Sequence, residues 1–485
     1  MRFWRQLALL FAAGALQVAA FAPIDSWPLG FISLAILFAN WRDAAPRAAA
    51  WRGFVWGMGC FLVGVSWVYV SMHDVGGMPA PIAALMTLLF AFYLALYPAL
   101  SGWVTARVSG GRTLSLFTTA AAWTLGEWLR GLIATGFPWL AVGYAQTPPS
   151  PLAGFAPLLG VYGVSFVVAL IAAALAELYR SRRLALPPSL VVLACFLAGA
   201  GLRFVHWTQP QGQPFTVSLL QGNVPQSLKW DPERLSLSME TYIGLASAHP
   251  AQLIVLPETA IPLMFSEIPK DYLRQLGGGK HHVLIGAAVG VGDSGYANGA
   301  VLLTPQLQPS AYFKHHLVPF GEFVPAGFQW FLDMMRIPMS NFTAGAQLQE
   351  ALMFDDQKIM PNICYEDLFG EELIGGAAQA NVLINLSNTA WFGHSLAQPQ
   401  HLQISQMRAL ESGRMMLRAT NTGMTAAVRP DGTVAAVLLP FEHDALVVNA
   451  QGYAGLTPYM RIGNSGIVAL ALALLGFAWH RTRRR

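Results

Sequence analysis

The sequence predicts a membrane α-helical bundle of about eight transmembrane helices, joined to an extracytoplasmic α/β domain. Of its 485 residues, 54% are hydrophobic and only 11% are charged, and the mean hydropathy is +0.46. Long apolar segments fill most of residues 1–210 and recur near the C-terminus, whereas residues 211–453 are more polar. This composition excludes an ordinary soluble protein.

Seven apolar segments precede residue 210, and an eighth follows the polar region. A helix needs about 20 apolar residues to cross a hydrocarbon core, and the second and eighth segments are short for this. An alternative for the first segment is a cleaved signal peptide, but a second apolar run follows so closely that we favour a retained helix. The segments are Leu7–Phe21, Trp27–Asn40, Phe54–Val70, Ile82–Val104, Leu114–Ile133, Leu152–Leu178, Ser189–Val205 and Ile467–Trp479.

Arginines concentrate in alternate connections, which predicts that those connections are cytoplasmic. The intervening connections Ala22–Ser26 and Ser71–Pro81 contain no lysine or arginine. Residues 211–453 are then extracytoplasmic, and the C-terminal tail is cytoplasmic. We therefore expect a bundle at 1–210, a soluble domain at 211–453 and a final helix with its basic tail at 454–485. The arginines are Arg2, Arg5, Arg42, Arg47, Arg52, Arg107, Arg112, Arg180, Arg182 and Arg183, followed in the tail by Arg481, Arg483, Arg484 and Arg485.

The soluble domain alternates short β-rich apolar runs with polar helical stretches, which is typical of an α/β fold. Nucleic-acid binding does not follow from the pI of about 9.0, because the arginines lie between apolar runs rather than along one face. We expect strands at Phe215–Gln221, Leu253–Leu256, His282–Val289, Ala300–Thr304, Ile359–Ile363 and Val382–Leu386, and helices at Arg234–Ser247 and Pro399–Arg418.

Three polar residues directly follow apolar strands of this domain: Glu258, Lys314 and Cys364. Strand ends are where open α/β sheets build their sites. Cys60 and Cys195 lie inside apolar runs, so Cys364 is the single thiol of the polar region. Its alternative role is that of a small buried hydrophobic residue.

Glu, Lys and Cys in this order resemble the catalytic residues of the nitrilase, or carbon–nitrogen hydrolase, superfamily. The resemblance covers most of residues 215–450 and implies an α-β-β-α sandwich. It extends to Ser387-Asn388, to Trp391-Phe392-Gly393 and to the stretch from Arg408 to Gly423. An alternative role for that stretch is purely structural, since Glu411 and Arg414 are three residues apart and can pair on a helix.

The chemistry of these residue types fits the resemblance. A thiol with a pKa near 8.5 is mostly protonated at neutral pH, and only the thiolate attacks well. Glu258 can take the thiol proton and later return it to a leaving group. Lys314 can stabilise the thiolate and the oxyanion, and the backbone N–H of Tyr365 is a second candidate donor.

A domain of this type combined with membrane helices is similar to the apolipoprotein N-acyltransferase family of the bacterial inner membrane. The further resemblance rests on Gly126–Arg130, Thr135–Trp139, Gln221–Asn223 and His316–Glu322. It implies supporting roles for Trp230, Asn298, Glu322, Tyr365 and Glu366. It also implies a membrane phospholipid as acyl donor, a diacylglyceryl-modified apolipoprotein as acceptor, and a catalytic domain in the periplasm. No cofactor, metal or nucleic acid is implied.

Several alternatives stay open from the sequence. A membrane-tethered amide or nitrile hydrolase would use the same three residues, and a transporter or receptor would only bind lipids or peptides. Trp391 and Phe392 are either an apolar lid over an acyl chain or core aromatics. Glu127 and Arg130 either pair at the membrane interface or position lipid headgroups or the catalytic domain.

Overall fold

The computed structural model describes residues 2–109, 116–181, 186–225, 235–292, 295–324 and 341–484. It divides into two compact units, one of residues 1–69, 80–206 and 461–485, and one of residues 70–79 and 207–460. Some residues named above lie outside the described residues: Arg112, Arg182, Arg183, Trp230 and Arg485.

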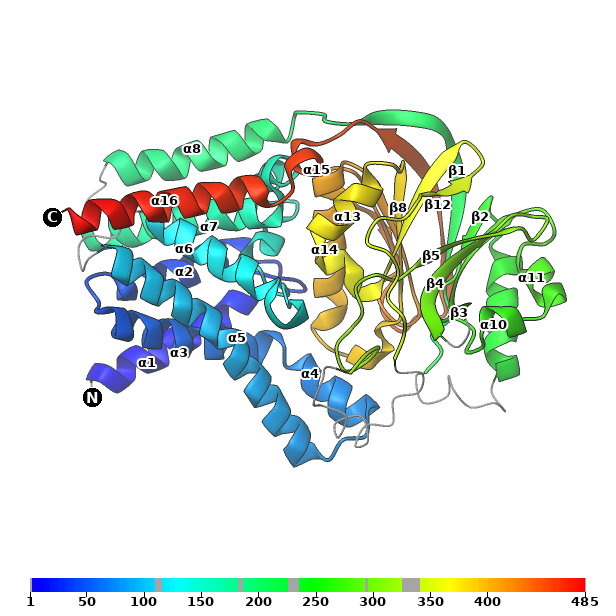
Figure 1. Ribbon diagram of the computed structural model, residues 1–485, viewed down its shortest axis with the longest axis horizontal. Coiled ribbons are helices and arrows are strands. Elements are labelled where there is room, and N and C mark those ends of the chain that lie inside the picture. The colour runs from blue at the N-terminus through cyan, green and yellow to red at the C-terminus, as the bar shows by residue number, and fades with distance from the viewer. Residues whose placement is uncertain are drawn as a thin grey trace. The chain divides into compact units, whose positions relative to one another are not determined.

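The first unit consists of helices (Figure 1). Each apolar segment predicted from the sequence overlaps one of its longer helices, and the segment Phe54–Val70 also extends past the break between Gly64 and Trp67. These helices are α1 (Arg2–Val18), α2 (Trp27–Trp41), α3 (Pro46–Gly64), α5 (Ala80–Ser109), α6 (Leu116–Arg130), α7 (Ala156–Ser181), α8 (Leu186–Leu202) and α16 (Ser465–Arg483). The described helical segments outside residues 211–453 also include the short helices α4 (Trp67–Val70) and α15 (Pro458–Ile462), a π-helical turn at Ser71–Val75 and three 3₁₀ turns (Ile133–Thr135, Val142–Gln146 and Pro151–Phe155).

Within the described residues, three helical stretches are long and apolar enough to cross a membrane: Ala80–Ser109, Pro151–Tyr179 and Ser465–Arg483. A fourth is possible if the bent pair Pro46–Gly64 and Trp67–Val75 forms one span. Three more apolar helices are shorter, at Phe3–Val18, Trp27–Trp41 and Leu186–Leu202. By length and composition, three or four of the described helical stretches could therefore cross a membrane, and the count of eight spans stays a prediction.

Small residues allow the helices of this unit to pack closely. A Cβ atom added at Gly14 of α1 would collide with the carbonyl oxygen of Trp56 on α3, and one at Gly59 of α3 would collide with that of Phe11 on α1. The two backbones are thus in direct contact at these glycines. This contact explains why helices of moderate length form a compact bundle.

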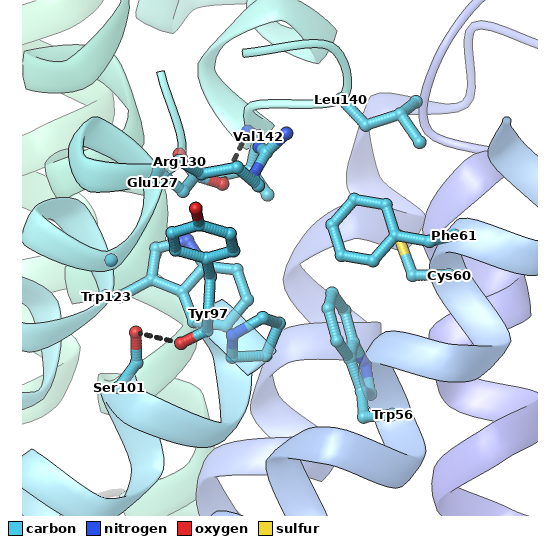
Figure 2. Close-up of a pocket in the computed structure, with 12 residues that line it drawn as sticks. Trp56, Cys60, Phe61, Tyr97, Ser101, Trp123, Glu127, Arg130, Leu140 and Val142 are labelled. Atoms are coloured by element: carbon cyan, nitrogen blue, oxygen red, sulfur yellow. Dashed lines mark hydrogen bonds between the residues drawn. The ribbon is translucent and has the colours of Figure 1, made fainter. Parts of the chain in front are cut away.

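The polar pair at the end of α6 binds the backbone of the segment that follows it. Arg130 donates from Nη1 to the carbonyl oxygens of Phe137 (2.6 Å) and Trp139 (2.5 Å). Glu127 accepts through Oε1 from the backbone N–H of Val142 at 3.0 Å. Both side chains are buried, so these bonds give the pair a structural role in holding residues 137–142. Figure 2 shows the small pocket that they line with aromatic residues, among them Trp56, Phe61, Tyr97 and Trp123.

Replacement of Arg130 tests this role. Arg130→Met leaves two buried carbonyl oxygens without their donor, which should cost about 1–3 kcal/mol for each. We expect a lower thermal unfolding midpoint for the purified protein in detergent. Arg461→Met, at an exposed arginine of the same unit, is the control, and equal midpoints for the two variants would contradict the structural role.

The second unit contains two six-stranded sheets. The first has the order β12-β1-β2-β3-β4-β5 and the second has the order β11-β10-β9-β8-β7-β6. In each sheet, three central strands are parallel and the outer pairs are antiparallel. The strands are β1 (Gln209–Gln221), β2 (Leu253–Val255), β3 (His282–Val291), β4 (Gly295–Leu303), β5 (Pro309–Phe313), β6 (Leu352–Phe354), β7 (Gln357–Ile363), β8 (Val382–Ser387), β9 (Met415–Thr420), β10 (Ala426–Val428), β11 (Val434–Val437) and β12 (Asp444–Ala454).

Helices cover the outer faces of the two sheets, as Figure 1 shows. Helices α10 (Leu235–Ala248) and α11 (Lys270–Leu276) pack on the first sheet through one apolar core. Helices α13 (Gly370–Ala377) and α14 (Ala397–Ser412) lie on the second sheet. A larger core joins residues of both sheets, with Leu219 and Leu284 from the first and Ile384 and Leu417 from the second. The expected α-β-β-α sandwich is thus confirmed, as are the six predicted strands.

The predicted helix Pro399–Arg418 was wrong at its C-terminal end. Helix α14 ends at Ser412, Gly413 adopts a left-handed conformation (φ 60°), and residues 415–420 form β9. The residues after Gly413 favour a helix by propensity. Residues 415–420 form a strand instead, because they are buried in the sheet between β8 and β10.

The alternative pairing of Glu411 with Arg414 on a helix was wrong for the same reason. Arg414 lies beyond the helix and donates to the carbonyl oxygens of Ala380 and Gly455, each at 2.8 Å. Glu411 pairs with Arg408 at 3.0 Å instead. Because the chain leaves the helix at Gly413, Arg414 no longer belongs to α14 and is the residue immediately before β9.

Candidate active site

The ends of three strands place Glu258, Lys314 and Cys364 in one buried site. Glu258 follows β2, Lys314 follows β5 and Cys364 follows β7. Their exposed fractions are 7%, 1% and 8%. The first two come from one sheet and the third from the other. The site therefore lies where strand ends of the two sheets meet.

Lys314 is held between two carboxylates. Its Nζ atom lies 3.4 Å from Oε1 of Glu258 and 2.8 Å from Oε2 of Glu322. Asn298 of β4 donates from Nδ2 to both carboxylates, at 2.7 Å to Glu258 and 2.8 Å to Glu322. The second oxygen of Glu258 accepts from the backbone N–H of Asn388 at 2.9 Å. The ammonium and the amide thus fix both carboxylates.

Burial and neighbouring charges raise the pKa of Cys364, and neighbouring charges raise that of Lys314. Burial raises the pKa of the Cys364 thiol and the charge of Glu258 raises it further, while Lys314 opposes them. Burial alone would lower the pKa of Lys314, but Glu322 and Glu258 outweigh it and hold this pKa above its usual value. The resting site therefore contains a neutral thiol beside a charged ammonium.

Cys364 has the backbone conformation of a tight turn. Its φ is +52°, which an L-residue with a side chain rarely adopts without support from its surroundings. The residue begins the 3₁₀ turn Cys364–Leu368 directly at the end of β7. The turn places the thiol at the end of the strand rather than on a face of the sheet.

Glu366 connects the turn at Cys364 to the segment at Lys314. Its Oε2 accepts from the backbone N–H of Ile363 at 2.6 Å, and its Oε1 accepts from that of His315 at 2.7 Å and from the Tyr312 hydroxyl at 2.9 Å. One carboxylate therefore binds the residue before the thiol and the residue after the ammonium. Burial raises the pKa of Glu366, against the effect of these bonds.

The remaining predicted residues lie in neighbouring turns. Tyr365 is buried and packs edge-on against the ring of Phe369. Trp391 and Phe392 are half-buried in a 3₁₀ turn after β8. The carbonyl oxygen of Trp391 accepts from the hydroxyl of Ser71 at 2.8 Å, within the same unit. Trp230 lies outside the described residues.

A second cluster of polar side chains is joined to the Cys364 turn through Asp367. The sequence did not predict that its members meet. The cluster consists of Asp367, His401, Ser405 and Arg418, all fully buried. His401 and Ser405 are four residues apart and share one face of α14, which is the pattern that could have suggested it. No sequence pattern connects that face to Arg418, which belongs to β9.

Two family models match the chain. The apolipoprotein N-acyltransferase N-terminal domain matches residues 13–174, and the carbon-nitrogen hydrolase matches residues 216–459. The apolipoprotein N-acyltransferase of Nitrosomonas europaea is 46% identical, covering 99% of this chain and 99% of that protein. The chain belongs to the apolipoprotein N-acyltransferase family. The member of this family from Chromobacterium violaceum is 47% identical, covering 98% of this chain and 95% of that protein.

Among solved structures, the chain is similar to an amidase of the nitrilase superfamily from Nesterenkonia. The TM-score is 0.39 at 18% identity, over 53% of this chain and 97% of the amidase. Membership of the carbon–nitrogen hydrolase superfamily rests on the family model, whose match covers the unit that contains both sheets. In this chain, that domain is combined with the N-terminal domain whose family model matches residues 13–174.

The contacts of Glu366 predict the effect of replacing it with glutamine. In Glu366→Gln, the amide nitrogen cannot accept a hydrogen bond, so one of the backbone N–H groups loses its partner. We expect the turnover rate to fall by about a hundredfold, because the segment that loses its bond to residue 366 shifts relative to the other. The measurement is the rate of acyl transfer by the purified variant. Glu371→Gln, at a half-buried carboxylate on α13, is the control, and equal rates for the two variants would contradict this role.

Proposed function

We propose that this protein transfers a fatty acyl group from a membrane phospholipid to the α-amino group of the lipid-modified N-terminal cysteine of an apolipoprotein. The acyl group passes through a thioester on Cys364, in a ping-pong reaction. Membership of the family supports the overall reaction. The observation that carries the chemistry is the buried thiol beside Glu258, Lys314 and Glu322.

The charge balance of the site supports Glu258 as the base. With a neutral thiol, Lys314 and the two carboxylates together carry one net negative charge. Loss of the thiol proton to water would add a second negative charge to a buried site, which is costly. Transfer of that proton to Glu258 leaves the net charge unchanged. The raised pKa of Cys364 is consistent with activation by a neighbouring base.

In the first half of the reaction, Glu258 accepts the thiol proton while the sulfur bonds to the carbonyl carbon of a phospholipid ester. The bond from that carbon to the glycerol oxygen then breaks, and Glu258 returns the proton to this oxygen. The products are a thioester and a lysophospholipid. Lys314 and the backbone N–H of Tyr365 donate to the oxyanion that forms between these steps.

In the second half, the α-amine of the apolipoprotein attacks the thioester carbonyl. Glu258 takes a proton from the nitrogen, the carbon–sulfur bond breaks, and the proton returns to the sulfur. An amide forms and the resting thiol is restored. Glu322 and Asn298 orient Lys314 and Glu258 throughout, because they bind these groups directly.

Transfer requires that water does not discharge the thioester first. We assign Trp391 and Phe392 as an apolar lid, because their turn directly follows Asn388, whose N–H binds Glu258.

The membrane-tethered hydrolase is the second candidate, since its chemistry would use the same thiol and base. The two differ in what happens to the acyl-enzyme without an amine.

For the membrane arrangement, we propose eight spans in a bacterial inner membrane. The soluble domain at 211–453 then faces the periplasm and the C-terminus is cytoplasmic. The arginine-rich connections support this orientation. The shorter apolar helices α1, α2 and α8 would cross as spans of 15 to 17 residues, which a bilayer accommodates by local thinning.

The acyl-enzyme is the decisive test of the mechanism. Wild-type protein supplied with phospholipid alone should gain the mass of one acyl group on Cys364, whereas Cys364→Ala and Glu258→Gln should not. A diacylglyceryl-cysteine peptide should then discharge the adduct as an N-acyl peptide. Intact mass and peptide mass spectrometry measure both steps.

The fate of the adduct separates the two candidate functions. Steady release of free fatty acid by wild type without a peptide would favour the hydrolase. Acyl transfer by Cys364→Ala at the wild-type rate would exclude the thioester.

The double variant Trp391→Ala with Phe392→Ala tests the lid. We expect slower acyl transfer and some release of fatty acid, because water reaches the carbonyl carbon of the thioester.

Reporter fusions test the orientation. An enzyme reporter at the C-terminus should be active in the cytoplasm. One inserted after Gly279, in the exposed turn that follows α11, should be active in the periplasm. A cytoplasmic signal from the second fusion would reverse the proposed sidedness without affecting the acyl-enzyme test.

A further inference from the structure

Three polar residues form a row across the central strands of the second sheet. Asn362 of β7 is in register with Asn385 of β8, which is in register with Arg418 of β9. Nδ2 of Asn385 donates to Oδ1 of Asn362 at 2.6 Å, and Nη1 of Arg418 donates to Oδ1 of Asn385 at 3.2 Å. The row begins two residues before Cys364.

Arg418 also forms the centre of the second polar cluster, which we name the Arg418 cluster (Asp367, His401, Ser405 and Arg418). Its guanidinium donates to Oδ2 of Asp367 at 3.0 Å, to the hydroxyl of Ser405 at 2.8 Å and to Nδ1 of His401 at 2.7 Å. Asp367 in turn accepts from Ser405 at 2.6 Å and contacts Nε2 of His401 at 2.7 Å.

These contacts define the protonation state of the cluster. A guanidinium only donates hydrogen bonds, so Nδ1 of His401 must accept. The ring proton is then on Nε2, which donates to Asp367, and the imidazole is neutral. The cluster therefore contains one buried ion pair, Asp367 with Arg418, and is neutral as a whole. Each member has its position fixed by at least two others.

The cluster reaches the nucleophile from two directions. Asp367 belongs to the same 3₁₀ turn as Cys364, three residues further on. Asn385, held by Arg418, donates from Nδ2 to the carbonyl oxygen of Cys364 at 3.3 Å. The first and the fourth residue of the 3₁₀ turn that presents the thiol are thus both bound to groups that Arg418 holds.

We propose that the Arg418 cluster positions Cys364 for attack, by holding its turn in the conformation that aligns the sulfur with Glu258 and Lys314. Buried ion pairs contribute little net stability, because desolvation offsets their attraction. A cluster of four fully buried polar residues therefore serves geometry more than stability. Its members do not touch the substrate in this proposal and act through the turn alone. The inference rests on the thiol chemistry proposed above.

Arg418→Lys is the main test, because lysine keeps the charge but cannot reproduce the planar fork that contacts three partners. We expect acyl-enzyme formation on Cys364 to slow by about tenfold to a hundredfold, with the KM for phospholipid nearly unchanged. Alkylation of Cys364 by iodoacetamide, followed by the mass of its peptide, should slow as well.

Arg414→Lys is the matched control. Arg414 is also buried, lies just before the same strand, and binds the carbonyl oxygens of Ala380 and Gly455, which belong to neither the site nor the cluster. Both variants should lose thermal stability. Only Arg418→Lys should lower the rates of acylation and alkylation at a temperature where both proteins are folded.

A milder pair of variants covers the case in which Arg418→Lys does not fold. Ser405→Ala removes the hydroxyl that donates to Asp367 and should slow acylation by a few fold, and Ser405→Thr should restore it, because the hydroxyl returns. Equal acylation rates in Ser405→Ala, Ser405→Thr and wild type would overturn the proposal. So would equal rates for Arg418→Lys and Arg414→Lys.

The outcomes also distinguish this proposal from the thioester mechanism. If wild type forms no adduct on Cys364, the thioester mechanism fails, whereas the alkylation rates still report the position of the thiol. If wild type forms the adduct and the cluster variants match their controls, the mechanism stands and the positioning role fails.

Discussion

The attraction between the buried ammonium of Lys314 and its two carboxylates is the interaction on which the rest of the site depends. A lysine that is 1% exposed is tolerated only with partners that repay its desolvation. Glu258 and Glu322 supply that compensation, and Asn298 binds both. If one carboxylate moved away, the ammonium would lose one of its two ion pairs and Asn298 one of its two acceptors. The geometry around the thiol is therefore fixed by electrostatics before any substrate binds.

The two-sheet architecture makes this arrangement possible. Parallel strands end at the same edge of a sheet, so residues that follow β2 and those that follow β7 meet when the two sheets face each other. The short backbone segments after the strands are then stabilised by buried side chains. Glu366 binds the segments at Cys364 and Lys314 together, and the Arg418 cluster binds the Cys364 turn from behind.

The same physical principle operates in the helical unit, with a different result. Arg130 and Glu127 are buried polar groups at the end of a helix, and their partners are backbone groups of residues 137–142. In an apolar setting, such bonds fix an irregular segment that would otherwise carry unsatisfied carbonyl and amide groups. Buried charge therefore organises a loop in one unit and the segment around Cys364 in the other.

The sequence by itself determined the class of the protein, the positions of its apolar helices and the six strands of strongest apolar pattern. It also singled out Glu258, Lys314 and Cys364, because these residues follow strands in the order that resembles the nitrilase superfamily, and the structure places the three close together. The end of α14 was missed, since Met415–Thr420 resembles a helix in composition and becomes a strand only by burial between β8 and β10. Only the tertiary structure showed that Arg418, His401 and Asp367 meet behind Cys364. They come from a strand, a helix and a turn, and contacts between such elements depend on how the chain packs rather than on any spacing along it.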